Sequence, residues 1–297
     1  MHFGWFGKPL ESTEQNVSGR TVVFALIGDP IDHSMSPTIQ NAAFRSTGLN
    51  AIYVPFRVES SGLRFAIQGM KFLGVRGFNV TTPHKTAMLR YLDEVETKAA
   101  EIKSINTVKS VGGTLTGFNT DGTGALNALK EAGVSPDGKS ILLFGAGGAA
   151  RAIAHALAGH RCEINIVNRT ISRAQRLASL LRVKFSIEAN CVSLSSRSLR
   201  RQVESADVIL NASSMGMAGN ENLPVHKKWL RPDQCVFDIV YRPVRTVLLR
   251  NAVLARARTI NGLDMLVSQG ACSFTIWTGK KAPISEMRRS IARFIGD

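Results

Sequence analysis

Several features that define other classes of protein are missing from this chain of 297 residues. No run of about 18 consecutive apolar residues occurs, so the sequence predicts no transmembrane helix and no membrane partner. The first 20 residues contain no apolar segment behind a basic start, so we expect no secretory signal. The cysteines form no C-x-x-C pair, which favours reduced thiols in the cytoplasm and predicts neither a metal site nor a disulfide framework. They are Cys162, Cys191, Cys235 and Cys272.

Acidic residues are scarce as well. The chain has 37 Lys and Arg residues against 22 Asp and Glu residues, which gives a formal net charge of +15. Such a balance is typical of nucleic-acid binding. However, the basic residues are spread along the sequence, only 3 Tyr and 3 Trp are present, and no aromatic-basic RNA motif occurs. We therefore predict no nucleic-acid partner and favour a basic surface that attracts anionic small molecules. Salt-sensitive retention on DNA would support the alternative.

The length suggests about two domains, and strands alternate with helices in each half. Residues 1–20 are interpreted as an extension outside the core. In the first half, strands are predicted at residues 21–27, 51–56 and 75–80, and helices near Pro37, over 59–73 and after Thr82-Pro83. In the second half, strands are predicted at 141–144, 163–167, 208–210 and 236–240, and helices at 149–158, 172–181, 263–277 and 284–295. The predicted fold class is α/β, with two domains and mostly parallel sheets.

A glycine-rich turn follows the first strand of the second half. It reads Gly145-Ala146-Gly147-Gly148-Ala149-Ala150, which is G-x-G-x-x-A between a strand and a helix. The first glycine permits a tight turn, the second leaves room for a pyrophosphate, and the small sixth residue lets helix and strand approach. The helix N-terminus adds amide donors and a positive dipole. The turn therefore predicts a Rossmann-type dinucleotide site.

The end of the next strand favours NADP over NAD. An NAD-binding protein usually carries Asp or Glu there, to accept a hydrogen bond from the ribose 2′-hydroxyl. This chain instead has Asn168, Arg169 and Thr170, with Arg173 one turn later. Guanidinium groups suit a 2′-phosphate. The alternative is a helix start capped by Asn168 or Thr170, with solvated arginines.

Polar residues follow the strands of the first half. Ser34 and Ser36 precede Pro37, which can open a helix, so their hydroxyls and nearby amides could hold a carboxylate. A plain N-cap serine is the alternative. Asn79 and Thr81 alternate onto one face at the end of a strand. Lys85 is placed in the first turn of the next predicted helix, where a cation opposes the dipole, and this conflict favours a functional role.

Three further polar side chains lie near predicted turns or inside an apolar helix. Asn106 and Asp121 are in turn contexts, although Asp121 could be a helix cap. Gln269 lies within the apolar helix 263–277, and a buried amide needs partners. Those partners could be backbone groups or a polyhydroxylated ligand. With the preceding residues, these side chains gather near strand carboxyl ends, where open α/β sheets bind ligands.

Together these motifs resemble the shikimate dehydrogenase family over nearly the whole chain, from about Val22 to Trp277. The matching segments are residues 28–37, 79–85, 106–108, 119–121, 145–151, 168–170, 211–217, 238–243 and 261–279. The resemblance implies reversible, NADPH-dependent reduction of 3-dehydroshikimate to shikimate in the chorismate pathway. It also implies a substrate domain formed by residues 21–120 and 262–297, and a Rossmann-type NADP-binding domain formed by residues 121–261.

The resemblance assigns roles residue by residue. Lys85 and Asp121 would be the catalytic pair. The substrate would be bound by Ser34, Ser36, Asn79, Thr81, Asn106, Tyr241 and Gln269. The cofactor would be bound by Gly145, Ala146, Gly147, Gly148, Ala149, Asn168, Arg169, Thr170, Arg173, Met217 and Gly262.

The chain departs from the commoner family residues at Gln40, at Lys103-Ser104 and at Ser213. None of these is a proposed catalytic group. Quinate and aminoshikimate dehydrogenases share the skeleton and remain alternatives, as does a non-catalytic NADP-sensing protein on the same fold. The expected assembly is a monomer or a homodimer.

Overall fold

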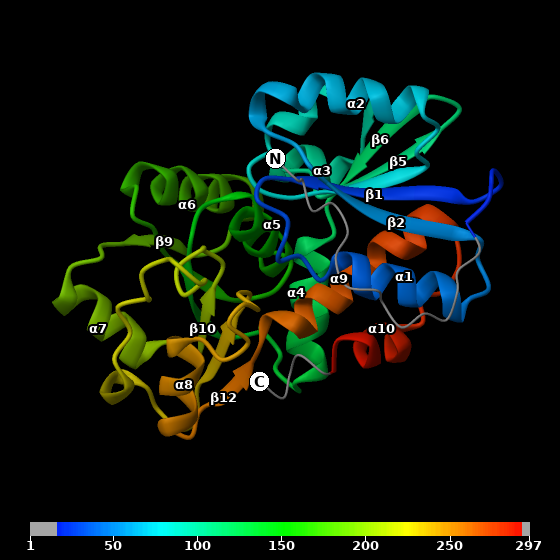
Figure 1. The fold of residues 1–297 in the computed structure, drawn as a ribbon. Coiled ribbons are helices and arrows are strands. Elements are labelled where there is room, and N and C mark those ends of the chain that lie inside the picture. The colour runs from blue at the N-terminus through cyan, green and yellow to red at the C-terminus, as the bar shows by residue number, and fades with distance from the viewer. Residues whose placement is uncertain (1–16, 293–297) are drawn as a thin grey trace, which may run out of the picture.

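The computed structural model describes residues 17–292. Within them the chain forms two six-stranded sheets, each with helices on both faces (Figure 1). All strands of the first sheet precede residue 119 and all strands of the second follow residue 139. Most of the predicted N-terminal extension lies outside the described residues. The domain limits at residues 120 and 261 stay a prediction, and the two sheets fall on either side of residue 120.

The first sheet is mixed, with strand order β2-β1-β3-β5-β6-β4. Parallel pairing joins β1 to both β2 and β3, whereas β5 runs antiparallel to β3 and β6. The strands are β1 Val22–Gly28, β2 Ala51–Arg57, β3 Gly77–Val80, β4 Glu94–Val95, β5 Thr107–Val111 and β6 Thr114–Phe118. The sequence prediction missed the β5–β6 hairpin, because it treated residues 105–108 and 117–122 as turns. The hairpin turns at Gly112 and Gly113, both with positive φ.

The second sheet is entirely parallel, with strand order β12-β11-β10-β7-β8-β9. Its strands are β7 Ser140–Phe144, β8 Glu163–Val167, β9 Ala189–Val192, β10 Val208–Asn211, β11 Cys235–Asp238 and β12 Arg258–Ile260. The four predicted strands are confirmed. The two missed strands, β9 and β12, are short edge strands with partly exposed residues, so they lack the continuous apolar run of a buried strand.

Helices cover both sheets. They are α1 Ser36–Ser46, α2 Leu63–Phe72, α3 Thr97–Ile102, α4 Asp121–Glu131, α5 Gly148–Leu157, α6 Ile171–Phe185, α7 Ser196–Ser205, α8 Val247–Leu254, α9 Gly262–Thr278 and α10 Ile284–Ile291. Short 3-10 turns are η1 Ser60–Gly62, η2 Ala87–Tyr91 and η3 Lys227–Trp229. The predicted end of the last helix at residue 295 lies outside the described residues.

Alternation along the strands builds a core on each face. In β1, Phe24 and Leu26 pack against α1, α9 and α10, whereas Ala25 and Ile27 face α2. In β7 the odd and even residues likewise enter two different clusters, one beneath α4, α5 and α6 and the other beneath α7 and α8. Both sheets are therefore covered by helices on both faces, and the strand ends are the edges that these helices leave uncovered.

The prediction of an α-helix directly after Thr82-Pro83 is wrong. Residues 82–86 form turns, and η2 begins only at Ala87. The reason is that the carbonyl of Lys85 accepts a hydrogen bond from Ile105 N at 2.8 Å, instead of from an amide four residues later. Lys85 therefore lies on a turn that is bonded to the segment before β5. The argument that its charge opposes a helix dipole does not apply.

Two helices from different parts of the chain lie side by side between the sheets. Figure 1 shows α4 and α9 crossing the centre of the molecule, and they pack against each other. A Cβ on Gly124 of α4 would lie 2.7 Å from Cβ of Gln269 on α9, so only glycine allows this approach. The start of α4, the middle of α9 and the strand ends of the first sheet consequently meet at one place.

Candidate active site

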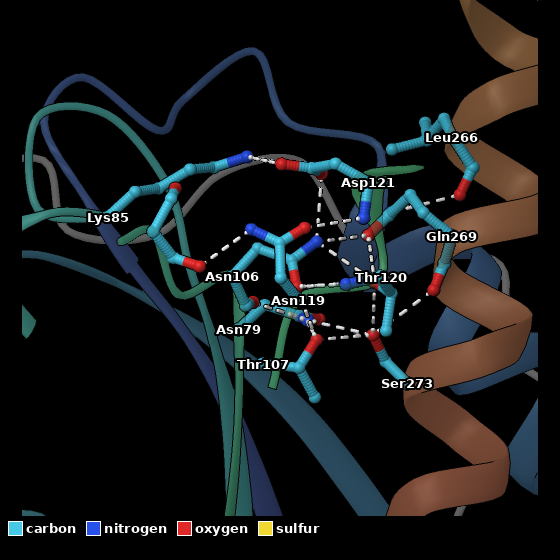
Figure 2. A network of polar contacts seen from close by, with 11 residues as sticks. Asn79, Lys85, Asn106, Thr107, Asn119, Thr120, Asp121, Leu266, Gln269 and Ser273 are labelled. Atoms are coloured by element: carbon cyan, nitrogen blue, oxygen red, sulfur yellow. Dashed lines mark hydrogen bonds and ion pairs between the residues drawn. The ribbon is translucent and has the colours of Figure 1, made fainter. Parts of the chain in front are cut away.

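An ion pair forms the centre of this meeting place. Nζ of Lys85 lies 2.6 Å from Oδ2 of Asp121, and their side chains are 19% and 6% exposed (Figure 2). Asp121 is the first residue of α4, where the helix dipole favours a carboxylate. This ion pair is sheltered from water, so salt screens it less than a surface pair, and Asp121 fixes the direction of the ammonium.

Asn106 holds the carboxylate of this pair. Its Nδ2 donates to Oδ1 of Asp121 at 2.8 Å and to Oγ1 of Thr120 at 2.9 Å. Its Oδ1 accepts from the amide of Thr120 at 2.8 Å and from Oγ1 of Thr107 at 2.9 Å. Asn106 is only 3% exposed. These bonds fix the amide orientation, so Asp121 keeps Oδ2 directed toward Lys85.

Asn79 extends the network to the helix α9. Its Nδ2 donates to the carbonyl of Asn106 at 3.0 Å, to Oγ1 of Thr107 at 3.1 Å and to Oγ of Ser273 at 3.1 Å. Its Oδ1 accepts from the hydroxyl of Tyr53 at 2.7 Å. Three protein acceptors surround the Nδ2 donors of Asn79. A ligand can therefore form a further hydrogen bond only with Oδ1, as the acceptor.

Gln269 approaches the same network from α9 (Figure 2). Its Nε2 donates to the carbonyl of Leu266 at 3.0 Å, within the helix. Its Oε1 lies 3.4 Å from both Nδ2 of Asn106 and Oγ1 of Thr120, at the long limit of a hydrogen bond. The side chain is half-buried. Because Oε1 makes only these long contacts, the hydroxyl of a ligand can compete for it as a hydrogen-bond donor.

A second group of hydroxyls combines Ser34 and Ser36, which follow β1, with Tyr241, which follows β11. Burial raises the pKa of the Tyr241 hydroxyl, whereas hydrogen bonding with the Ser34 side chain lowers it. Ser36 is 7% exposed and is the first residue of α1. Met35 occupies the N-cap position, so neither serine is the N-cap residue, although Ser34 Oγ accepts from Ser36 N at 3.3 Å at the start of the helix. The hydroxyls of Ser34 and Tyr241 are thus brought together from distant segments.

The glycine turn forms as its sequence predicts. Gly145 has a φ of +113°, and a Cβ there would lie 2.8 Å from the carbonyl of Ala212, so glycine is required. A Cβ on Gly147 would meet nothing within 4 Å, which leaves the room that a pyrophosphate needs. A Cβ on Gly148 would lie 3.5 Å from carbons of Lys85. The turn therefore lies directly beside the ion pair.

The residues after β8 also lie beside this turn, because Gly145 N donates to the carbonyl of Val167 at 2.8 Å. Arg169, Thr170 and Arg173 are exposed. Thr170 occupies the N-cap position of α6, but its side chain accepts no capping bond, and Asn168 donates to its carbonyl at 2.9 Å. Two free-standing guanidinium groups next to the turn fit a 2′-phosphate.

Met217 and Gly262 lie on the other side of the turn. Met217 is half-buried in the loop that follows β10. Gly262 begins α9, and a Cβ there would lie 2.3 Å from the carbonyl of Ile239. The loops after β10 and β11 are tied together by Asp238, whose carboxylate accepts from Asn211, Val240 N and Thr246. Burial raises the pKa of Asp238 to about 6.

Sequence analysis missed several members of the network. Tyr53, Thr107, Thr120 and Ser273 were not proposed as site residues, although each bonds to one that was. Ser273 carries a readable signal, since it lies four residues after Gln269 on the same helix face. Tyr53 carries none, because it is one aromatic residue within an ordinary strand. Thr81 is half-buried, and its side-chain methyl group lies beside Gly28.

Residues 17–292 were also compared with the requirements of a metal site and of a membrane span. There, no three His, Cys, Asp or Glu side chains are grouped so that they could hold a metal ion. The same residues include no helix that is long and apolar enough to span a membrane. The four cysteines are free thiols.

Comparison with known proteins agrees with this geometry. Three family models match consecutive parts of the chain. They describe the shikimate dehydrogenase substrate binding domain at residues 26–108, shikimate / quinate 5-dehydrogenase at 127–240, and the shikimate 5'-dehydrogenase C-terminal domain at 262–291. Shikimate dehydrogenase (NADP(+)) of Moorella thermoacetica is 44% identical over 282 residues, which cover 94% of this chain and 96% of the relative. The chain belongs to the shikimate/quinate dehydrogenase family.

Solved structures of the family share the fold. A crystal structure of a shikimate dehydrogenase in complex with NADP+ is 42% identical, with a TM-score of 0.87, covering 94% of this chain and 97% of the other. Shikimate 5-dehydrogenase from Listeria monocytogenes, in complex with shikimate and NAD, is 37% identical with a TM-score of 0.84, covering 94% and 99%. The predicted two-unit α/β fold is therefore confirmed.

The departures from the commoner family residues are only partly accommodated, because Gln40 Oε1 and Ser104 Oγ are buried without a hydrogen-bond partner among the described residues. Gln40 Nε2 donates to the carbonyl of Gly270 at 2.9 Å, and Ser213 Oγ donates to Oδ1 of Asn211 at 2.7 Å. Lys103 ends α3 with a φ of +55°, a conformation that glycine adopts more readily. None of these positions belongs to the Lys85–Asp121 pair, so they leave its geometry intact.

Proposed function

We propose that the chain catalyses the reversible, NADPH-dependent reduction of 3-dehydroshikimate to shikimate, a step of chorismate and aromatic amino-acid biosynthesis. The observation that carries this proposal is the position of the Lys85–Asp121 pair beside Gly148, at the start of the nucleotide-binding helix. A proton donor and a dinucleotide turn meet there, as reduction of a carbonyl requires.

Lys85 is the proton donor and acceptor of the proposed reaction. Bound NADPH supplies the hydride, and negative charge then develops on the carbonyl oxygen of the substrate. The ammonium of Lys85 stabilises that charge and donates a proton to the oxygen. In the oxidation direction, the neutral amine accepts the hydroxyl proton. Asp121 pairs with the ammonium of Lys85 and directs it, while Asn106 holds Asp121.

The substrate's carboxylate and ring hydroxyls are assigned to the two polar groups of the first sheet. Ser34, Ser36 and Tyr241 would hold the carboxylate. The ring hydroxyls fall to the network side chains Asn79, Asn106 and Gln269, together with Thr81. Such ground-state contacts provide orientation toward Lys85. In this proposal the carboxylate is recognised by hydroxyl and amide donors.

NADP is assigned to the glycine turn and to the residues that follow β8. Gly145, Gly147 and the N-terminus of α5 fit a pyrophosphate, and Arg169 with Arg173 fit a 2′-phosphate. The proposal includes a cytoplasmic location, with which the free thiols are consistent, and a monomeric or homodimeric state. The partner is a small molecule.

The test is the absorbance of the reduced nicotinamide band with purified protein and every combination of shikimate or quinate with NADP or NAD. We expect the largest rate with shikimate and NADP. A larger rate with quinate would favour the quinate dehydrogenase alternative, and aminoshikimate can be tested in the same way. Absence of reduction in all mixtures, with NADPH still bound, would instead support the non-catalytic sensor.

A further inference from the structure

The side chain of Arg151 joins the nucleotide-binding helix to the first half of the chain. Arg151 lies in the first turn of α5, directly after the glycine turn. Its Nη2 donates to the carbonyl of Lys103 at 2.8 Å and to Oγ1 of Thr86 at 3.1 Å. Thr86 directly follows Lys85 in the chain, and Lys103 begins residues 103–105, which we call the connecting segment. The guanidinium therefore holds two stretches of backbone against α5.

The connecting segment is bonded in turn to both members of the ion pair. The amide of Ile105 donates to the carbonyl of Lys85 at 2.8 Å. The carbonyl of Ser104 accepts from Nδ2 of Asn119 at 2.7 Å, and Oδ1 of Asn119 accepts from the amide of Asp121 at 3.0 Å. The backbone on which the guanidinium acts is thus the backbone that holds the proton donor and its partner.

Other contacts keep this region against the nucleotide-binding half of the chain. A Cβ on Gly148 would lie 2.6 Å from Oγ of Ser104, so the absence of a side chain there allows the close approach. Glu101 of α3 lies 2.7 Å from Nε2 of His155 on α5 and 2.7 Å from Nζ of Lys184 on α6. These contacts do not involve Arg151, so a change of Arg151 would leave α3 attached to α5 and α6.

Stability alone gives little reason for an arginine at this position. Burial lowers the pKa of Arg151, and its Nε is buried with no hydrogen-bond partner among the described residues. An unpaired buried donor reduces stability. Both acceptors, in contrast, belong to exposed residues, so water can replace the guanidinium at Thr86 and Lys103. An apolar side chain of similar length should therefore be tolerated by the fold.

We propose that Arg151 is a positioning residue, which holds the connecting segment, and through it Lys85 and Asp121, at a fixed place beside the glycine turn. The inference rests on the proposed function, because the place of Lys85 matters for catalysis only if Lys85 exchanges a proton with a substrate at that turn. Reaction rates depend steeply on position, and a displacement of about 1 Å can cost on the order of 10²-fold. Without the guanidinium, Lys85 would keep its bond to Asp121, but the pair would be held less firmly beside the turn.

The kinetic test is Arg151→Met, which keeps a side chain of similar length and removes every donor. We expect kcat for shikimate oxidation to fall about 10–100-fold, because the proton acceptor is no longer fixed. The KM for shikimate and the Kd for NADPH should stay within about threefold, because the residues assigned to binding are unchanged. Arg151→Lys can still donate to the carbonyl of Lys103, so it should recover part of the lost kcat.

Arg258→Met is the matched control. Nη1 of Arg258 also donates to backbone carbonyls, those of Ala132 at 2.6 Å and Gly133 at 3.3 Å. These bonds join β12 to the chain that follows α4, at the opposite end of that helix from Asp121. The control should therefore leave kcat unchanged. An unchanged kcat in Arg151→Met, with a raised Kd for NADPH, would show that Arg151 contacts the cofactor and would overturn the inference.

Hydrogen exchange of the Ile105 amide tests the link without substrate or cofactor. This amide donates to Lys85, so we expect it to exchange about tenfold faster in Arg151→Met and at the wild-type rate in Arg258→Met. Unchanged exchange at Ile105 would contradict the proposal, as would an equal increase throughout α3 and α5, which would indicate general loosening.

A second variant covers the case in which Arg151→Met does not fold. Thr86→Val removes one of the two acceptors, so it should lower kcat by about 2–5-fold and speed exchange at Ile105 to a smaller extent. No change in either quantity would overturn the inference equally. A wild type that oxidises neither shikimate nor quinate would count against the proposed function, whereas exchange at Ile105 would still decide whether Arg151 holds Lys85.

Discussion

The proposed substrate side and the proposed cofactor side of the active site are built in different ways. On the substrate side, side chains from distant segments bond to one another, and Asn79 and Ser273 are separated by 194 positions in the chain. On the cofactor side, the two recognised elements are short continuous stretches, residues 145–151 and 168–173. The comparison teaches that the proposed dinucleotide site is specified by short local segments, whereas the proposed substrate site requires the complete fold.

The two sides also differ in how deeply their side chains are buried. Asn79, Asn106 and Asp121 are 6%, 3% and 4% exposed, while Arg169 and Arg173 are exposed. Buried polar groups are costly to leave unpaired, so changes on the substrate side should affect chemistry and stability together. Changes to the exposed arginines should affect only cofactor affinity.

The largest expected effect is at Lys85. Lys85→Ala should lower kcat by roughly 10²–10⁴, because a positioned proton donor contributes about that factor. Steady-state rates at saturating shikimate and NADP measure this, with calorimetry to show that shikimate affinity changes far less. Lys71→Ala is the matched control, since Lys71 forms a surface ion pair with Asp93 at 3.0 Å. Near-wild-type kcat in Lys85→Ala would remove Lys85 from the mechanism.

Asp238 is an exception to this difference in burial, because it is a fully buried carboxyl group on the cofactor side. Burial raises its pKa to about 6, above the unfolded value of 3.8. Its contribution to stability is therefore fully present below pH 3.8 and is lost as the pH rises through 6. The difference of about two pKa units corresponds to roughly 3 kcal/mol as an upper estimate.

Asp238→Asn should lack this dependence. Urea unfolding at several pH values would show the wild type losing stability relative to the variant as the pH rises between about 4 and 7. Comparing the two proteins cancels the opposite contributions of Asp93, Glu101 and Asp137, whose pKa values are lowered by hydrogen bonds and ion pairs. Parallel stability curves would show that Asp238 titrates normally.

Substitution of Arg169 tests whether NADP affinity depends on the short segment 168–173. Arg169→Ala should weaken NADP binding by roughly 10–100-fold and leave NAD almost unchanged, because a hydrogen bond to a charged group contributes about 1.5–3 kcal/mol. Arg169→Lys should restore only part of the affinity, since it lacks the planar fork. Fluorescence titration with both reduced cofactors measures this, with exposed Arg64 of α2 as the control position. Equal losses for NADP and NAD would contradict the assignment of Arg169 to the 2′-phosphate.

The smallest expected effect is at Gln269. Its bonds to the network are long, so Gln269→Ala should raise the KM for shikimate by only about 2–10-fold, with little change in melting temperature. Gln68→Ala, at an exposed position of α2, is the control. A lower melting temperature with an unchanged KM would show that Gln269 is only a core amide.

These contrasts explain what could be predicted from the sequence. The glycine turn and Arg169 were read from local spacing, because the strand–turn–helix unit that positions them is continuous. Lys85 and Asp121 were proposed through a family resemblance, and the helix predicted around Lys85 does not form. Tyr53 was missed, because its importance depends on pairing between β1 and β2 and on a bond to the neighbouring strand β3.

The central claim is that the catalytic step depends on the assembled substrate side, whereas the preference for NADP depends on the short segment after β8 that contains Arg169. The most direct test is the single-turnover rate of nicotinamide reduction in Lys85→Ala and in Arg169→Ala, with shikimate and NADP both saturating. The account predicts a rate roughly 10²–10⁴-fold below wild type for Lys85→Ala and a rate within about twofold of wild type for Arg169→Ala. Similar losses in the two variants, or the larger loss in Arg169→Ala, would contradict it.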